Sequence, residues 1–345
     1  MTQLEREIAA QPEVLERLLA GERVRVERLA RAVKRAGVHT VLVVARGSSD
    51  NAGLYGKYLL GARNGLLVAL AAPSLVTLYR RPPRLAGVLV LAISQSGASE
   101  DLRQVVAEAR RQGAPSLVLT NRTRSPLANE ADEVLPLHAG LERSIAATKT
   151  YTAELLALAM LSVALDGGRA EREALRRVPA AVAAALEAAR GVEAQAARYR
   201  YAERLAVIGR GFNYATAFEL ALKLKELAYV TAEPSSSADF RHGPIAVVQE
   251  GFPALLVAPR GRTARDMQAL AAELATRRAE TIIISDVPGL LRRARTPLRL
   301  PLGVPEWLSP ISAVVPGQLF ARHLAGAKGC PVDRPRGLRK ETITR

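Results

Sequence analysis

The sequence predicts an α/β protein made of two similar doubly wound domains, each with a parallel sheet covered by helices. Short apolar runs rich in Val, Ile and Leu alternate with segments of helical periodicity, and a polar turn follows several of these runs. Strands that alternate with helices at short spacing are typical of parallel βαβ units. The same order of elements starts again in the second half of the chain, which indicates an internal repeat.

The first half of the chain supplies an N-terminal helical segment, residues 1–36, and a first domain, residues 37–166. Apolar side chains recur at helical spacing between residues 4 and 36, and Gly37 is a helix-stop signal. Within the domain we expect strands at residues 41–45, 66–70, 87–93, 116–120 and 134–137, and helices at residues 51–60, 99–112 and 148–165.

A helical joint, residues 167–199, separates this domain from a second one, residues 200–328. The apolar run Leu205–Gly209 and the loop after it, Arg210–Asn213, repeat the first strand and its polar turn. Further strands are expected at residues 254–258 and 281–285, and helices at residues 214–229 and 309–327. Residues 329–345 follow as a C-terminal tail.

Composition narrows the class of protein. With 345 residues and 49% hydrophobic residues the chain can bury a large core, which excludes disorder of the whole chain. The apolar runs are far shorter than the ~20 residues that span a bilayer. The start of the chain is charged and amphipathic, unlike a secretory signal, so we expect a cytoplasmic protein. The single cysteine, Cys330, excludes an intrachain disulfide and a cysteine-based metal cluster.

The positive charge of the chain favours small anions over nucleic acid. The chain has 49 Lys and Arg against 33 Asp and Glu, a formal net charge of +16. The arginines are scattered rather than grouped in blocks, and aromatic residues make up only 4% of the chain. We therefore expect neither nucleic acid nor a membrane as a partner, and an electrostatic field that attracts small anionic substrates.

A hydroxyl-rich loop, Ser94-Gln95-Ser96-Gly97-Ala98-Ser99, follows the expected strand at residues 87–93 and leads into a helix. Ligands of open α/β sheets bind at the carboxyl ends of strands, and a helix N-terminus attracts anions. Capping of the helix by Ser96 or Ser99 is the alternative, but capping explains one serine and not three serines with a glutamine. The loop therefore favours a phosphate site.

Two further glycine-containing loops follow strands of the predicted sheets. Ser49, in the loop after residues 41–45, is a candidate second-line phosphate donor if that strand and residues 87–93 are neighbours. Gly209-Arg210-Gly211 lacks the third glycine of a dinucleotide fingerprint, because Tyr214 stands in its place. We therefore expect no nicotinamide cofactor.

Lys223, Glu226 and His242 are candidates for acid–base chemistry. Lys223 and Glu226 are three residues apart and share one face of a helix, and His242 lies between an arginine and a Gly-Pro turn. An exposed salt bridge is the more common reading of such a helix pair, and a histidine that hydrogen-bonds its own turn is about as common as a catalytic one. Spacing alone leaves these alternatives open.

Six segments along the chain form a recognisable pattern: Ala45–Asn51, Ser94–Gly97, Ser144–Lys149, Ala221–Glu226, Arg241–Pro244 and Asp333–Lys340. Together they resemble the sugar isomerase (SIS) family, whose two domains have a flavodoxin-like fold. The resemblance covers nearly the whole chain, and it is closest to the isomerase half of glucosamine-6-phosphate synthases and to the SIS-type glucosamine-6-phosphate deaminases.

This resemblance implies a role for each candidate residue. Ser94, Gln95, Ser96 and Ser99 would hold the substrate phosphate, with Ser49 nearby. Glu226 would move a proton between C1 and C2 of the sugar, and Lys223 would assist at the sugar oxygens or position Glu226. His242 would assist ring opening, in this family often in the neighbouring subunit's site, which implies a homodimer. Lys340, in the tail, would contact the open-chain carbonyl and could form an imine with it. No metal or organic cofactor is implied.

Departures from the synthase pattern favour a deaminase. The synthases carry a catalytic cysteine just after the initiator Met, and Met1-Thr2-Gln3 has none. Ala147 stands where the synthases have a serine, and Arg241 where they have a lysine. The segment Arg46–Asn51 is closer to the deaminase pattern than to the synthase pattern. We therefore expect conversion of glucosamine 6-phosphate to fructose 6-phosphate and ammonia. The alternatives are a synthase-like isomerase that uses free ammonia and a non-catalytic sugar-phosphate sensor; the joint presence of Glu226, His242 and Lys340 argues against the sensor.

Overall fold

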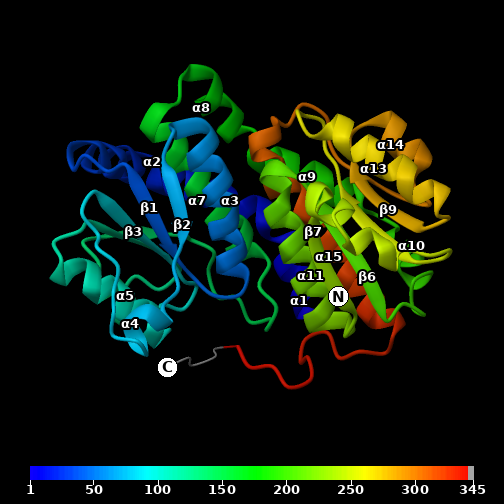
Figure 1. Cartoon of the computed structure of the whole chain (residues 1–345), viewed down its shortest axis with the longest axis horizontal. Coiled ribbons are helices and arrows are strands. Elements are labelled where there is room, and N and C mark those ends of the chain that lie inside the picture. The colour runs from blue at the N-terminus through cyan, green and yellow to red at the C-terminus, as the bar shows by residue number, and fades with distance from the viewer. Residues whose placement is uncertain (341–345) are drawn as a thin grey trace. The chain divides into compact units, whose positions relative to one another are not determined.

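The structure of the protein is a computed structural model that describes residues 1–340 (Figure 1). The chain forms two compact units, each built around one parallel sheet. The first-repeat unit comprises residues 13–142 and 149–176 with residues 339 and 340, and the second-repeat unit comprises residues 1–12, 143–148 and 177–338. The domain boundaries expected from the sequence, at residues 37–166 and 200–328, stay a proposal.

The sheet of the first-repeat unit has five parallel strands in the order β2-β1-β3-β4-β5. The strands are β1 (Thr40–Val44), β2 (Leu67–Leu70), β3 (Val88–Ile93), β4 (Ser116–Thr120) and β5 (Glu133–Pro136). The predicted α/β class is confirmed, and this strand order is that of a flavodoxin-like doubly wound sheet. β1 pairs with β3 and sets Val44 opposite Ala92, so the loops that follow these two strands begin side by side.

Helices cover both faces of this sheet. They are α2 (Gln11–Arg35), α3 (Ser48–Asn64), α4 (Ser74–Thr77), α5 (Glu100–Arg111), α6 (Pro126–Glu130), α7 (Lys149–Asp166) and α8 (Arg169–Arg176). α3 packs against α7 and against β1 and β2. On the opposite face, Leu102, Val105 and Val106 of α5 form a buried cluster with Val90 and Val118 of the sheet.

The second-repeat unit has the same strand order, written β10-β9-β8-β6-β7 from its other edge. Its strands are β6 (Arg204–Gly209), β7 (Thr231–Ser236), β8 (Pro253–Val257), β9 (Glu280–Ser285) and β10 (Thr296–Arg299). β6, β7, β8, β9 and β10 therefore correspond in sequence order to β1, β2, β3, β4 and β5. The predicted repeat of one domain plan is confirmed.

The helices of the second-repeat unit are also divided between two faces (Figure 1). They are α1 (Gln3–Ala9), α9 (Val178–Ala188), α10 (Val192–Ala197), α11 (Tyr214–Ala228), α12 (Ser237–Arg241), α13 (Ala264–Thr276), α14 (Pro288–Arg293) and α15 (Ser309–Ala327). α11 packs closely on α15, where a Cβ atom at Gly317 would lie 2.4 Å from Leu220 side-chain atoms. α13 contributes Met267 and Leu270 to a core on the other face. No helix within residues 1–340 is long and apolar enough to cross a membrane.

Two helical expectations differ from the structure. The helix expected across residues 4–36 is two helices, α1 and α2, separated at Ala10. Pro12 is the reason, because proline fits the first turn of a new helix but breaks the interior of a continuous one. The helix expected from residue 51 begins at Ser48, so Ser49 lies in its first turn and not in a loop.

The strands β7 and β10 were not expected from the sequence. Both are edge strands of their sheet. β7 contains Glu233 and Pro234, and β10 contains Pro297, so neither has the uninterrupted apolar run of a central strand. An edge position tolerates such residues because only one side of the strand pairs.

Candidate functional site

The hydroxyl loop, Ser94–Ser99, joins the end of β3 to the start of α5. The connection after β4 supports its backbone, since Leu127 N donates a hydrogen bond to Gly97 O at 3.2 Å. Gly97 has a φ of +61°, and a Cβ atom there would lie 2.0 Å from Ser125 Oγ. The loop makes a sharp turn directly before the helix N-terminus, and only glycine fits the backbone and the space at this turn.

The serines of the hydroxyl loop do not act as side-chain caps of α5. Ser99 is the N-cap residue, yet its side chain makes no capping hydrogen bond. Ser94 Oγ accepts from Gly97 N at 3.2 Å, and Ser96 Oγ accepts from Ala98 N at 3.3 Å. A hydroxyl that accepts a hydrogen bond can still donate one. The loop therefore offers hydroxyl donors beside a helix N-terminus, an arrangement suited to a phosphate.

The acidic residues in the first turn of α5 are paired with arginines. Asp101 accepts from Arg46 at 2.8 Å and 2.7 Å. Glu100 accepts from Arg103 at 2.7 Å and 2.8 Å, and hydrogen bonds from Arg103 and Gln104 lower the pKa of Glu100 to about 2. Because each carboxylate has its own arginine, the helix N-terminus keeps its attraction for an external anion.

Ser49 lies in the first turn of α3 and is almost fully buried. Its hydroxyl donates to Glu154 Oε1 of α7 at 2.8 Å. In this arrangement the hydroxyl hydrogen points at a carboxylate, so contact with a phosphate would require the Ser49 side chain to rotate. A role of Ser49 as a phosphate donor stays a prediction.

Glu142 connects two residues that were predicted independently as parts of the site. Its carboxylate accepts from Gln95 Nε2 of the hydroxyl loop at 3.1 Å and lies 3.8 Å from Lys340 Nζ of the C-terminal tail. The same carboxylate accepts from the backbone N–H groups of Lys149 at 2.9 Å and Thr150 at 3.4 Å, at the start of α7. The Glu142 side chain is fully buried. Sequence analysis did not identify Glu142, since it stands seven residues before α7, outside the spacing of a capping box.

A charge cluster around a buried lysine lies on α11 in the second-repeat unit. Lys223 Nζ is 2.5 Å from Glu226 Oε2 and 3.4 Å from Glu219 Oε1, and the Lys223 side chain is almost fully buried. Burial opposes the charge on Lys223, but the carboxylates of Glu219 and Glu226 outweigh it and raise the pKa of this lysine above its ordinary value. The alternative of an exposed salt bridge does not hold. Glu219 was not identified from the sequence, although its position four residues before Lys223 places it on the same face.

His242 follows α12 and is exposed. Its backbone N–H donates to Asp239 O at 3.0 Å. Within residues 1–340, no hydrogen bond or ion pair joins its imidazole to Glu226 or Lys223. The preceding Arg241 is held by Asp266 at 2.9 Å and by Glu273 at 2.9 Å, which fixes the backbone next to the histidine. The catalytic role expected of His242 stays a prediction.

The two groups of candidate residues belong to different units. The hydroxyl loop, Glu142 and Lys340 belong to the first-repeat unit, whereas the α11 cluster and His242 belong to the second-repeat unit. The residues present in the first group suit phosphate binding, and those in the second suit proton transfer. Among residues 1–340, no group of three His, Cys, Asp or Glu side chains is arranged to hold a metal ion.

A comparison with protein families identifies the repeat. The model of the SIS domain matches residues 36–164 and residues 199–325, one match for each sheet and more than half of the chain in total. The chain belongs to the SIS-domain family. The predicted resemblance to this family is therefore confirmed.

Relatives of this SIS protein include glutamine–fructose-6-phosphate aminotransferases (isomerizing). The enzyme of that name from Thermus thermophilus is 37% identical across 97% of this chain and 58% of its own length. The one from Pyrococcus horikoshii is 34% identical across 97% of this chain and 56% of its own length. This SIS protein thus spans a little over half the length of these curated relatives.

Solved structures of SIS proteins share the fold. The C-terminal domain of glucosamine-fructose-6-phosphate aminotransferase from Francisella tularensis is 26% identical, with a TM-score of 0.88 over 97% of this chain and 98% of that one. Glucosamine-6-phosphate deaminase from Thermotoga maritima is 20% identical, with a TM-score of 0.79 over 99% of this chain and 100% of that one. At that identity the second likeness shows the fold alone.

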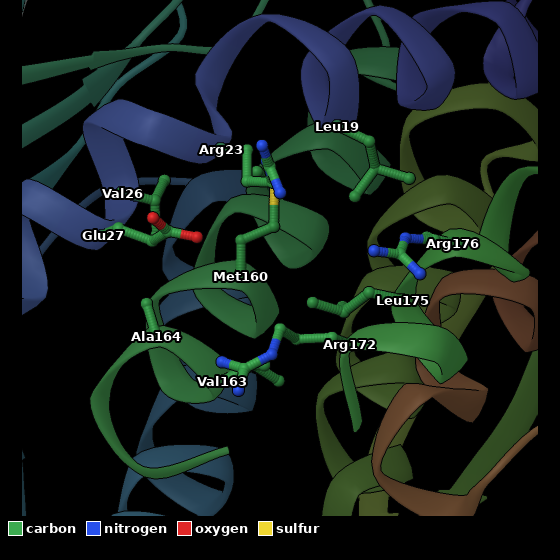
Figure 2. Close-up of a pocket in the computed structure, with 10 residues that line it drawn as sticks. All are labelled: Leu19, Arg23, Val26, Glu27, Met160, Val163, Ala164, Arg172, Leu175 and Arg176. Carbon is green, nitrogen blue, oxygen red and sulfur yellow. The ribbon is translucent and has the colours of Figure 1, made fainter. Parts of the chain in front are cut away.

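A separate cavity of about 110 Å³ lies in the first-repeat unit between α2, α7 and α8 (Figure 2). Figure 2 shows side chains from all three helices around it, with Met160 of α7 among charged residues of α2 and α8. It is lined by Leu19, Arg23, Val26, Glu27, Met160, Val163, Ala164, Arg172, Leu175 and Arg176. None of the residues predicted to bind or convert a sugar phosphate lines this cavity.

Proposed function

We propose that this SIS protein converts glucosamine 6-phosphate to fructose 6-phosphate and ammonia. The observation that carries the proposal is the Glu219–Lys223–Glu226 cluster on α11, in which Glu219 and Lys223 are buried. Buried charges are costly to the fold, and groups of them with a perturbed pKa are concentrated at functional sites. The cluster therefore favours a catalytic protein over one that only binds a sugar phosphate.

Phosphate binding is assigned to the hydroxyl loop. The phosphate would accept hydrogen bonds from the hydroxyls of Ser94, Ser96 and Ser99, from the amide of Gln95, and from backbone N–H groups at the start of α5. The arginines paired with Glu100 and Asp101 offset the negative charge of these carboxylates, which would otherwise repel the substrate phosphate. The phosphate would therefore serve as the anchor that holds the sugar in one orientation.

Ring opening and the proton shift are assigned to His242 and Glu226. Ring opening moves a proton from the C1 hydroxyl to the ring oxygen, a task suited to an imidazole, which can accept and return a proton near neutral pH. Glu226 would then take the proton from C2 of the open-chain aldehyde and return it to C1. The ammonium of Lys223, 2.5 Å from Glu226 Oε2, would hold that carboxylate in place as the base.

Loss of nitrogen is assigned to Lys340. The proton shift leaves an imine at C2, and the lysine amine would add to this carbon and displace ammonia, forming an imine with the enzyme. Water would then hydrolyse that imine and release fructose 6-phosphate. One molecule of water is consumed, and the nitrogen of the substrate leaves as ammonia. The proposal includes a homodimer, in which His242 of the partner subunit assists the ring opening described above.

The direction of the reaction follows from departures in the sequence. Ala147 and Arg241, and the deaminase-like segment Arg46–Asn51, favour the deaminase direction by their resemblance to that branch of the family. The second candidate is the reverse reaction with free ammonia, and the 37% identity to a glutamine–fructose-6-phosphate aminotransferase favours it. Both candidates use the same residues, since they are opposite directions of one equilibrium.

Incubation of the purified protein with glucosamine 6-phosphate tests the proposal. We expect ammonia and fructose 6-phosphate to appear in equal amounts, and a separate coupled assay measures each product. A Glu226→Gln variant should lose at least about a hundredfold in turnover, because it removes the base. Faster formation of glucosamine 6-phosphate from fructose 6-phosphate and an ammonium salt than deamination, at equal sugar-phosphate concentrations, would favour the second candidate. Binding without turnover in either direction would contradict both.

A further inference from the structure

The carboxylate of Glu142 is fully buried and carries a charge that the fold must compensate. The backbone N–H groups of Lys149 and Thr150 at the N-terminus of α7 provide part of the compensation. These groups have no intrahelical partner, and the helix N-terminus favours a negative charge. A purely structural role as the cap of α7 would need only these contacts.

The other contacts of Glu142 come from distant parts of the chain. Gln95 belongs to the hydroxyl loop after β3, and Lys340 belongs to the C-terminal tail. Both were assigned to the site from the sequence, Gln95 at the phosphate and Lys340 at the carbonyl. One buried carboxylate therefore joins the residue at one end of the expected substrate to the residue at its other end.

The contact fixes the orientation of the Gln95 amide. An ionised carboxylate only accepts hydrogen bonds, so Gln95 must direct its NH2 group, and not its oxygen, toward Glu142. The backbone of Gln95 is held as well, because Gln95 O accepts from Asn121 N at 3.2 Å and from Thr120 Oγ1 at 3.3 Å. With its main chain and side chain both held, Gln95 offers the second hydrogen of its NH2 group in one fixed direction.

We propose that Glu142 is a positioning residue that orients Gln95 for the substrate phosphate and holds Lys340 at the carbonyl end of the sugar. This inference rests on the proposed function for Lys340, whereas the part that concerns Gln95 requires only that the hydroxyl loop binds phosphate. The attraction between Glu142 and Lys340 would hold the lysine in place, since residues 329–340 form no helix or strand that could fix it.

Two substitutions separate positioning by charge from structural support. Glu142→Gln keeps the size of the side chain and an oxygen for the α7 N–H groups but removes the charge. Glu142→Asp keeps the charge but shortens the side chain. If Glu142 only supports α7, the glutamine variant should resemble the parent at least as closely as the aspartate variant. If Glu142 acts as proposed, the aspartate variant should retain more turnover than the glutamine variant.

For Glu142→Gln we expect a larger loss in kcat than in phosphate affinity. In Glu142→Gln we expect kcat for glucosamine 6-phosphate to fall about tenfold to a hundredfold, because Lys340 is no longer held in register. We expect affinity for inorganic phosphate, measured by isothermal titration calorimetry, to fall several-fold because the Gln95 amide can turn. Reduction with borohydride in the presence of fructose 6-phosphate should label Lys340 less in this variant, as measured by mass spectrometry.

Glu22→Gln is the matched control, because Glu22 is another buried carboxylate of the first-repeat unit, paired with Arg25 and His138 and with none of the predicted site residues. It should change the melting temperature without changing phosphate affinity or kcat. If the parent binds phosphate but does not turn over the sugar, the proposed function fails, and the phosphate affinities of the two Glu142 variants alone decide the present inference. Parent-like phosphate affinity and parent-like kcat in a folded Glu142→Gln variant would overturn it.

Discussion

The two repeats place a six-residue loop at the same position, after the third strand in sequence and before a long helix. In the first-repeat unit this is the hydroxyl loop between β3 and α5, and in the second-repeat unit it is residues 258–263 between β8 and α13. The fourth residue is glycine in both, Gly97 and Gly261, and the last residue carries a hydroxyl at the helix N-cap. The two loops differ in what faces them.

The loop of the second-repeat unit is filled by a carboxylate of the chain itself. Glu306 accepts from the backbone N–H groups of Arg262 at 2.9 Å and Thr263 at 3.3 Å, and from the Thr263 hydroxyl at 3.2 Å. Within residues 1–340, no carboxylate is recorded at the backbone N–H groups of the corresponding Ala98 and Ser99. The fold thus presents the N–H groups of a helix N-terminus at the same position in both repeats, and among residues 1–340 a carboxylate accepts from them only in the second. This supports phosphate binding by the hydroxyl loop.

The largest expected effect tests whether the second-repeat unit contributes chemistry and not phosphate binding. Lys223→Met leaves the carboxylates of Glu219 and Glu226 without their cation, so we expect a loss of about 3–5 kcal/mol in the free energy of unfolding. Turnover should be abolished, while phosphate affinity of the folded variant stays within about twofold, because Lys223 is not among the residues assigned to the phosphate. Urea denaturation measures the stability, calorimetry the phosphate affinity, and coupled product assays the turnover. Normal turnover in a folded variant would contradict the assignment.

A pair of glycine substitutions compares the loops directly. At Gly97 a Cβ atom would lie 2.0 Å from Ser125 Oγ, and at Gly261 it would lie 2.2 Å from Glu306 Cδ. Each Gly→Ala substitution should lower stability by about 1–3 kcal/mol through overpacking. Only Gly97→Ala should weaken the binding of inorganic phosphate, by at least about tenfold. Equal losses of phosphate affinity in both variants, measured by calorimetry, would show that the two loops are not functionally distinct.

Removal of the internal carboxylate should make the second loop more like the first. Glu306→Ala takes an anion from the N-terminus of α13, so we expect stability to fall by about 1–2 kcal/mol. Inorganic phosphate should raise the melting temperature of this variant more than that of the parent. Glu250→Ala is a suitable control, since Glu250 forms an exposed pair with Arg278. A variant as stable as the parent would mean that Glu306 contributes nothing at this position.

The smallest expected effect concerns Glu100, the first residue of α5. The corresponding first residue of α13 is Ala264. The pKa of Glu100 is lowered to about 2 by Arg103 and Gln104, so its contribution to stability is present above its ordinary value of 4.5 and lost as the pH falls through about 2. Because the pair is partly exposed, we expect only a few tenths of a kcal/mol. A carboxylate titration by NMR should show this pKa rising toward 4.5 in Arg103→Gln; an unchanged pKa would exclude Arg103 as its cause.

The sequence was sufficient to predict the central strands and the hydroxyl loop. β1, β3 and β4 are uninterrupted apolar runs, and a strand that leads through serines and glycine into a helix has a recognisable local pattern. β7 could not be predicted in this way, because Pro234 is acceptable only at the edge position that the folded sheet creates. The break between α1 and α2 could have been predicted from Pro12.

The residues that the sequence did not reveal are those whose role depends on tertiary contacts. Glu142 contacts Gln95, 47 residues away, and Glu306 contacts Arg262, 44 residues away. No local spacing relates such pairs, and each glutamate taken alone resembles an ordinary surface residue. Glu219 is different, since it is one helical turn before Lys223 and a wider window on α11 would have included it.

Binding of fructose 6-phosphate tests the central claim, that the hydroxyl loop holds the phosphate, most directly. Calorimetric titration should be performed on the parent, on the double variant Ser96→Ala/Ser99→Ala, and on Thr263→Ala, which removes the corresponding hydroxyl of the second loop. We expect one site per chain in the parent, a loss of more than about tenfold in affinity in the double variant, and parent-like affinity in Thr263→Ala. Unchanged affinity in the double variant, or a matching loss in Thr263→Ala, would contradict the account.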